Sequence, residues 1–136
     1  MSDLRPLQLK PILILDAVTC VVMGLLLTLL PDVLSPITGI PMDILVYSGL
    51  VLFPVAALMA IVARRYTQSS AAMVIIVAGN VLWVIASVGL MLSPAVQLTV
   101  IGQVFIAAQA FVVAALAVVE YRTSQSATSI PAGART

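Results

Sequence analysis

Residues 71–92, AAMVIIVAGNVLWVIASVGLML, decide the fold, because no charged side chain interrupts them. At a rise of about 1.5 Å per residue, a helix of this length crosses the roughly 30 Å hydrocarbon core of a bilayer. In lipid every backbone N–H group needs a partner within its own segment, which a helix supplies and a lone strand does not. This stretch therefore predicts a transmembrane α-helix.

Three further apolar stretches have the same character and cover residues 12–30, 44–63 and 98–119. The chain of 136 residues is 62% hydrophobic and 8% charged, which excludes an ordinary soluble domain. We expect an all-α fold, a membrane-spanning four-helix bundle, with residues 1–122 as one transmembrane domain. Residues 123–136 are rich in Ser, Thr and Ala without apolar periodicity, and predict a disordered cytoplasmic tail.

The basic residues indicate the orientation of these spans. All six lie before the first stretch, between the second and the third, or after the fourth: Arg5, Lys10, Arg64, Arg65, Arg122 and Arg135. The connections 31–43 and 93–97 contain no Lys or Arg. The positive-inside rule therefore predicts cytoplasmic N- and C-termini in a multi-pass protein of the cell membrane. A bacterial inner membrane suits so small a chain.

The first stretch has a competing interpretation as a cleavable signal peptide, since basic residues precede it. Its apolar run is longer than a typical signal sequence and no A-x-A site follows, so we expect it to be retained. The connection 31–43 that follows holds three prolines, which argue against one regular helix. Its apolar residues favour a position along the membrane interface.

The two halves of the chain show a weak 2+2 repeat. Asp16 precedes Pro31 by nearly the same length as Asn80 precedes Pro94. A duplication of this kind is typical of parallel-repeat transporters. Chance similarity between apolar helices explains the pattern at least as well.

Several functional classes are excluded or disfavoured by what the chain lacks. It has no histidine and one cysteine, Cys20, so neither a disulfide framework nor a Cys-rich zinc site is expected. A net charge of +1 without a basic run argues against nucleic acid. No motif predicts an enzyme, a metal or a cofactor, although a lipid, quinone or pigment held by apolar contact stays open.

Asp16 is the only acidic residue that we place clearly inside a span. Four residues spaced by four share its helix face: Asp16, Cys20, Gly24 and Thr28. A charge inside a membrane is costly, so it marks either a proton or cation site or a carboxylate with a structural partner. In the second interpretation Arg64 or Lys10 pairs with the carboxylate, or a neighbour on the helix caps it. The sequence leaves both open.

Polar residues of the last two spans complete the candidate ligand or ion pathway. Asn80 and Gln109 fall about 14 and 15 Å from the cytoplasmic ends of their helices, near the midplane, which predicts a hydrogen bond between them. Helix association is the favoured role of such a bond, with ligand contact as the alternative. Trp83 lies one turn beyond Asn80, and its indole N–H needs a partner. Gln103 is placed nearer the outer side.

Small residues predict the surfaces through which the helices pack, because they let two backbones approach closely. These packing residues are Gly24, Gly49, Ala56, Ala60, Ala107, Ala110 and Ala114.

The chain resembles small uncharacterised bacterial four-span integral membrane proteins. The resemblance extends over nearly the whole chain and is carried by Asp16-Ala17, residues 39–41 (GIP), residues 49–54 (GLVLFP), residues 63–65 (ARR), residues 80–83 (NVLW) and Gln109-Ala110. It implies a fold and no activity. Small multidrug transporters share the length and the early acid, but they carry it as glutamate and tolerate dual orientation, which the one-sided basic residues oppose.

Two functional hypotheses follow. The first is a structural or accessory membrane protein that acts through helix contacts with itself, as a homo-oligomer, or with a larger membrane complex in the surrounding lipid. The alternative is a small proton-coupled transporter or channel-like oligomer in which Asp16 titrates.

Overall fold

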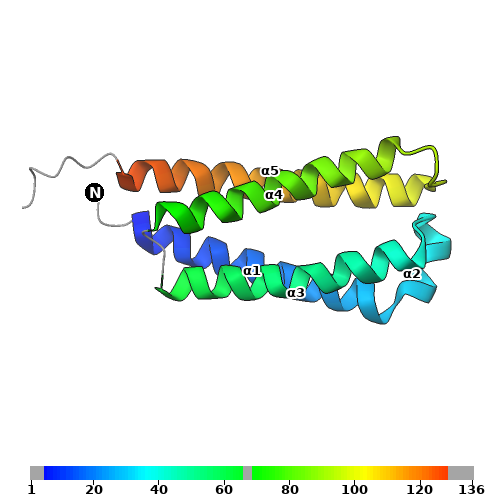
Figure 1. Ribbon diagram of the computed structural model, residues 1–136, viewed down its shortest axis with the longest axis horizontal. Coiled ribbons are helices and arrows are strands. Elements are labelled where there is room, and N and C mark those ends of the chain that lie inside the picture. The colour runs from blue at the N-terminus through cyan, green and yellow to red at the C-terminus, as the bar shows by residue number, and fades with distance from the viewer. Residues whose placement is uncertain (1–4, 66–68, 129–136) are drawn as a thin grey trace, which may run out of the picture.

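The computed structural model describes residues 5–65 and 69–128 of the chain. Within these residues the protein is all-helical and contains no strand. The helices, in chain order, are α1 (Arg5–Leu29), α2 (Pro31–Thr38), α3 (Met42–Arg65), α4 (Ser70–Leu92) and α5 (Val100–Thr128). They run side by side along one axis, with α2 at one end (Figure 1).

Four of the helices are long and apolar enough to cross a membrane. Their apolar segments are Lys10–Leu29, Met42–Arg65, Ser70–Leu92 and Val100–Thr123. Large hydrophobic side chains cover their outer surface: Leu92 is 78% exposed and Phe111 75%. Such a surface suits lipid contact, and the prediction of an all-α multi-pass bundle is confirmed at this level.

The long helices form two pairs. α1 packs mainly on α3, α4 packs on α5, and contacts between α1 and α5 join the pairs. α3 and α4 follow each other in the chain, and their backbones approach closely at few points, although Met59 and Ala63 of α3 belong to one buried cluster with Met73 and Ile76 of α4. Figure 1 shows the α1–α3 pair and the α4–α5 pair as two separate layers.

Two glycines bring α1 and α3 together. A Cβ atom at Gly24 would lie 3.1 Å from the carbonyl oxygen of Gly49, and one at Gly49 would lie 2.8 Å from Cγ2 of Thr28. There is no room for either methyl group without movement. The absence of side chains lets the backbones touch, which is how helices associate where lipid removes the hydrophobic drive.

The connection 31–43 is more regular than its prolines suggested. Pro31 occupies the first turn of α2, where its missing N–H costs nothing, and α2 continues to Thr38 despite Pro36. Gly39 then ends the helix with φ of 74°, and its N–H group donates to the carbonyl of Ser35. The connection is thus one short helix followed by a turn.

Hydrogen bonds from Thr99 hold α2 against the start of α5. The Thr99 N–H donates to the Thr38 carbonyl at 3.0 Å, and the Thr99 hydroxyl donates to the Ile37 carbonyl at 2.6 Å. A Cβ atom at Gly102 would overlap the Thr38 carbonyl. This contact closes one end of the bundle across the two helix pairs.

The last helix is longer than the predicted span. α5 continues through Thr128, so residues 123–128 are helical where a disordered tail was predicted. Residues 129–136 of that tail lie outside the described residues.

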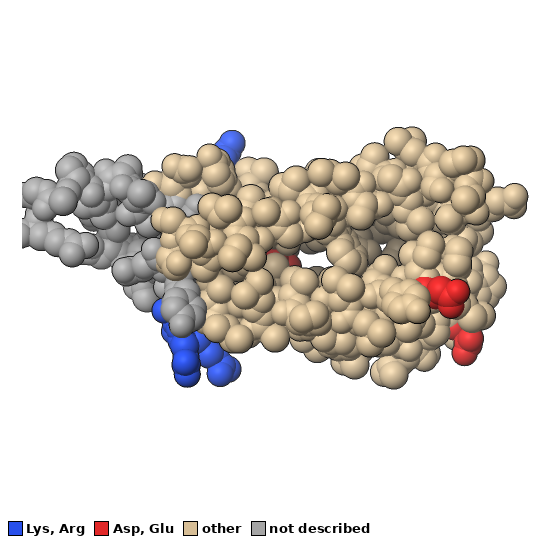
Figure 2. Space-filling view, in the orientation of Figure 1, with Lys and Arg blue, Asp and Glu red and all other residues tan. Residues whose placement is uncertain are grey.

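Charges separate to the two ends of the bundle. Lys and Arg side chains gather at the end where α1 begins and α3 ends, and the exposed acids Asp32 and Asp43 lie at the α2 end (Figure 2). The middle of the surface carries no exposed charge among the described residues.

Candidate functional site

Three buried polar residues from three helices meet inside the bundle. Asp16 of α1 is 3% exposed, Asn80 of α4 is 6% exposed, and Glu120 of α5 is fully buried. The side-chain amide of Asn80 donates a hydrogen bond to Oε2 of Glu120 at 3.0 Å. Helical spacing brings them inward, because Asp16 follows the fully buried Leu13 and Glu120 follows the buried Ala117 by one turn.

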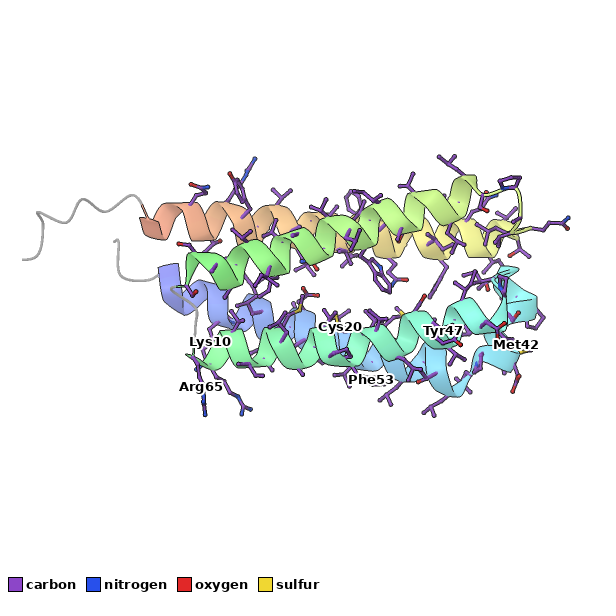
Figure 3. All side chains as sticks on the ribbon, viewed as in Figure 1. Lys10, Cys20, Met42, Tyr47, Phe53 and Arg65 are labelled. Atoms are coloured by element: carbon purple, nitrogen blue, oxygen red, sulfur yellow. The ribbon has the colours of Figure 1, made fainter. Side chains whose placement is uncertain are left out.

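The carboxyl groups of Asp16 and Glu120 face each other, and Asn80 lies beside both. The Cys20 thiol points to Oδ1 of Asp16 at 3.9 Å, a long contact from a weak donor. The remaining oxygens, Oδ2 of Asp16 and Oε1 of Glu120, are buried and accept no hydrogen bond from residues that the structure describes. Figure 3 places Cys20 between the end marked by Lys10 and Arg65 and the end marked by Met42 and Tyr47.

Oδ2 of Asp16 and Oε1 of Glu120 accept no hydrogen bond from a lysine or arginine among the described residues. Lys10 and Arg64, which the sequence offered as partners of Asp16, are both exposed, so the ion-pair interpretation is not found. Two adjacent carboxylates repel strongly in a low-dielectric interior. The arrangement is therefore stable only when a proton or another cation neutralises part of the charge. Among the described residues no group of three or more His, Cys, Asp and Glu is placed to hold a metal ion.

A cavity of about 600 Å³ lies between the two helix pairs. Its volume falls within the range that binds small organic molecules, roughly 300–1,000 Å³. Most of its wall is aliphatic or aromatic, and its polar lining is confined to Asp16, Thr19, Cys20, Asn80 and Gln109. Figure 2 shows the molecule hollowed at mid-length, with an acidic side chain visible inside.

A second cavity of about 190 Å³ continues toward the α2 end. Trp83, Phe105 and Gln109 line both cavities and so form the partition between them. Beyond the partition the lining includes the hydroxyl groups of Ser48 and Ser87, although Ser87 donates to the Trp83 carbonyl at 2.8 Å. Together the cavities follow the long axis of the bundle for much of its length.

The predicted pathway residues separate into three groups. Asp16 and Asn80 belong to the buried cluster, while Trp83 and Gln109 form the partition. Gln103 is exposed on α5 and lines neither cavity, so its placement in the pathway is not supported. The predicted hydrogen bond from Asn80 to Gln109 is wrong, because Asn80 donates to Glu120 instead. The Trp83 indole N–H makes no hydrogen bond to the described residues.

Glu120 is the residue that sequence reasoning missed. The apolar stretch was ended at Val119, one residue too early, and Asp16 was taken as the only acid inside a span; the full burial of Glu120 shows otherwise. A usable signal was present. Inward positions of α5 recur at Ile106, Val113 and Ala117, and the same spacing of three and four reaches Glu120.

The predicted packing residues differ in burial. Gly24 and Gly49 lie at the α1–α3 contact and Ala56 is buried, whereas Ala107 is exposed on α5. The three others are half-buried: Ala60, Ala110 and Ala114.

No protein-family model, no curated protein and no solved structure matches the chain. The resemblance to small bacterial four-span membrane proteins stays a prediction.

Proposed function

We propose that this protein is a small proton-linked membrane transporter, in which Asp16, Asn80 and Glu120 form the proton-binding site and the larger cavity holds the substrate. One observation carries the proposal: Asp16, which lines the cavity, and Glu120 are buried close together, and one carboxyl oxygen of each accepts no hydrogen bond from the described residues. Unpartnered carboxyl groups inside membrane bundles are costly and mark proton or ion sites.

The cluster can exchange a proton for another positive charge. A proton shared by Asp16 and Glu120 relieves their repulsion, and a cation at the same place does so equally. Both occupy the unsatisfied oxygens, so their binding is mutually exclusive. A membrane carrier couples two fluxes by this kind of competition. The few close backbone approaches between α3 and α4 support movement of one helix pair against the other as the accompanying conformational step.

The proposal is tested by proton entry into vesicles. Purified protein is reconstituted into liposomes that contain a pH-sensitive dye, and a potassium diffusion potential drives protons inward. We expect acidification by the unmodified protein to fall at least tenfold in Asp16→Asn. Asp32→Asn, which neutralises an exposed acid at the α2 end, is the matched control and should leave the rate unchanged. Equal rates in Asp16→Asn and the unmodified protein would contradict the proposal.

We further propose that both termini are cytoplasmic and that the protein resides in a bacterial cell membrane. The gathering of Lys and Arg at one end of the bundle supports this orientation. Lys10 is the only lysine of the chain and is exposed. A membrane-impermeant amine reagent should therefore label the protein in inside-out vesicles and not in right-side-out vesicles. Labelling from both sides would indicate dual orientation.

The accessory-protein hypothesis stays a prediction, as do the homo-oligomer and the 2+2 repeat. It was founded on helix packing without chemistry, whereas the buried carboxyl pair favours transport. A stoichiometric partner protein retained in native mass spectrometry of gently extracted membranes would restore it as the leading hypothesis.

A further inference from the structure

The polar lining of the larger cavity lies mainly in the corner around Asp16, and the other walls are apolar except for the Gln109 amide at the partition. Asp16 lines the cavity, and Oδ2 of Asp16 is buried and has no hydrogen-bond partner in the described part of the chain. Opposite this corner the partition presents the aromatic rings of Trp83 and Phe105. A ligand that fits such a space has an apolar body and a single head that donates hydrogen bonds or carries positive charge.

The cavity opens sideways as well as along the bundle. Leu58 of α3 and Ile75 of α4 both line the cavity, and both lie on the outer surface, at 38% and 58% exposure. Gly79 of α4 also lines the cavity and is exposed, and it has no side chain that could close the opening. Exposed residues of both α3 and α4 thus border the cavity where the two backbones are not closely packed, and the opening between these helices lies within their apolar segments. A ligand can therefore enter from the hydrocarbon layer.

We propose that the larger cavity binds lipid-soluble organic amines in their ammonium form, admitted from the bilayer between α3 and α4, with Asp16 as the counter-ion. This inference rests on the proposed function and names its substrate class. The ammonium head supplies both missing features of the polar corner, a hydrogen-bond donor and a positive charge. The apolar body packs on aliphatic residues of α3 and on the rings of the partition, whose faces also attract cations.

Each element around the cavity except α3 places polar or titratable groups near Asp16. α1 adds the Thr19 hydroxyl and the Cys20 thiol, and α4 adds the uncharged amide of Asn80. α5 adds the uncharged amide of Gln109 and the carboxyl group of Glu120, which lies close to Asp16 but does not line the cavity. α3 contributes only apolar side chains to the lining. The ammonium group therefore competes with protons for the two carboxyl groups, and its binding should weaken as the pH falls.

Trp83 makes the proposal directly testable. It is the only tryptophan of the chain and lines the cavity, so any change in tryptophan emission reports on this place. The protein in lipid vesicles is titrated with three probes of one skeleton: 4-phenylbutylamine, 4-phenylbutan-1-ol and 4-phenylbutyrate. We expect a saturable change with the amine, at least tenfold weaker apparent affinity for the alcohol, and no response to the carboxylate.

Two sets of variants test separately the charge of Asp16 and the opening beside Gly79. Asp16→Asn should weaken amine binding at least tenfold and leave alcohol binding unchanged. Gly79→Leu should fill the opening and abolish the response to the amine. Gly89→Leu is its matched control on the same helix, because a Cβ atom at either glycine meets nothing within 4 Å and Gly89 does not line the cavity. Gly89→Leu should bind the amine as the unmodified protein does.

Proton release, measured in the same experiment, separates this inference from the proposed function. In weakly buffered solution, amine binding should release protons from the unmodified protein. Equal affinity for the amine and the alcohol, unchanged amine binding in Asp16→Asn, or equal effects of the two glycine variants would overturn the inference. Absence of any amine response, alongside Asp16-dependent proton flux in vesicles, would overturn the inference and leave the proposed function standing. Proton flux that does not depend on Asp16 would contradict the proposed function itself.

Discussion

The end of the bundle at α2 and its middle are built in opposite ways. At the α2 end, Gly39 and Gly102 leave no room for a methyl group, and Thr99 donates two hydrogen bonds to the carbonyls that close α2. In the middle, Gly79 borders open space, and Oδ2 of Asp16 and Oε1 of Glu120 accept no hydrogen bond within residues 5–65 and 69–128. Close backbone contacts at the α2 end thus hold together a bundle whose middle contains a cavity and buried carboxyl groups with incomplete hydrogen bonding.

This contrast follows from the surroundings of the chain. Lipid is as apolar as the side chains, so no hydrophobic effect drives the helices to pack along their whole length. Association depends on a few places where backbones touch. Between those places, cavities and polar groups without hydrogen bonds remain and lower the stability of the fold. Functional sites commonly reduce stability in this way.

The largest effect should come from breaking the contact at the α2 end. Gly102→Ala puts a methyl group onto the Thr38 carbonyl, and the backbone has to move to admit it. We expect a loss of about 3 kcal/mol in the free energy of unfolding, measured by titration from mild detergent into sodium dodecyl sulfate. Gly89→Ala is the control, and its higher helix propensity should give a gain of up to about 1 kcal/mol. Equal stability of the two variants would refute the close docking of α2 on α5.

A smaller loss should follow at the α1–α3 contact. Gly49→Ala places its Cβ 2.8 Å from a methyl carbon of Thr28 and 2.9 Å from the Gly24 carbonyl oxygen. Thr28 can rotate but the carbonyl cannot, so we expect a loss of about 2 kcal/mol on the same titration. Gly79→Ala, in open space, should lose nothing. A neutral Gly49→Ala would mean that α1 and α3 are not held together here.

The smallest effect should have the opposite sign and lie in the middle. Glu120→Gln removes the repulsion between the carboxyl groups and keeps a side chain of the same shape beside Asn80. We expect a gain of about 1 kcal/mol in the free energy of unfolding together with loss of proton entry into vesicles. A variant that loses stability and keeps its proton flux would show that the pair is structural.

The spans could be predicted closely and the site only in part. Hydropathy located all four long helices, because the need to pair every backbone N–H in lipid leaves no alternative. Asp16, Asn80, Trp83 and Gln109 were found because a polar or amphipathic side chain within an apolar run is conspicuous. Glu120 was not, since a polar residue at the end of a run is read as its boundary.

The sequence by itself determined the all-helical class, the apolar segments and the confinement of basic residues to one predicted side, because these properties depend on each segment alone. Only the tertiary structure decided which helices touch, that Asn80 pairs with Glu120 rather than Gln109, and that Asp16 has an acidic neighbour instead of a basic one. Those outcomes depend on helix rotation and on contacts between α1, α4 and α5, which lie far apart in the chain. In lipid a few close contacts between small residues set that rotation, and hydropathy carries no information about it.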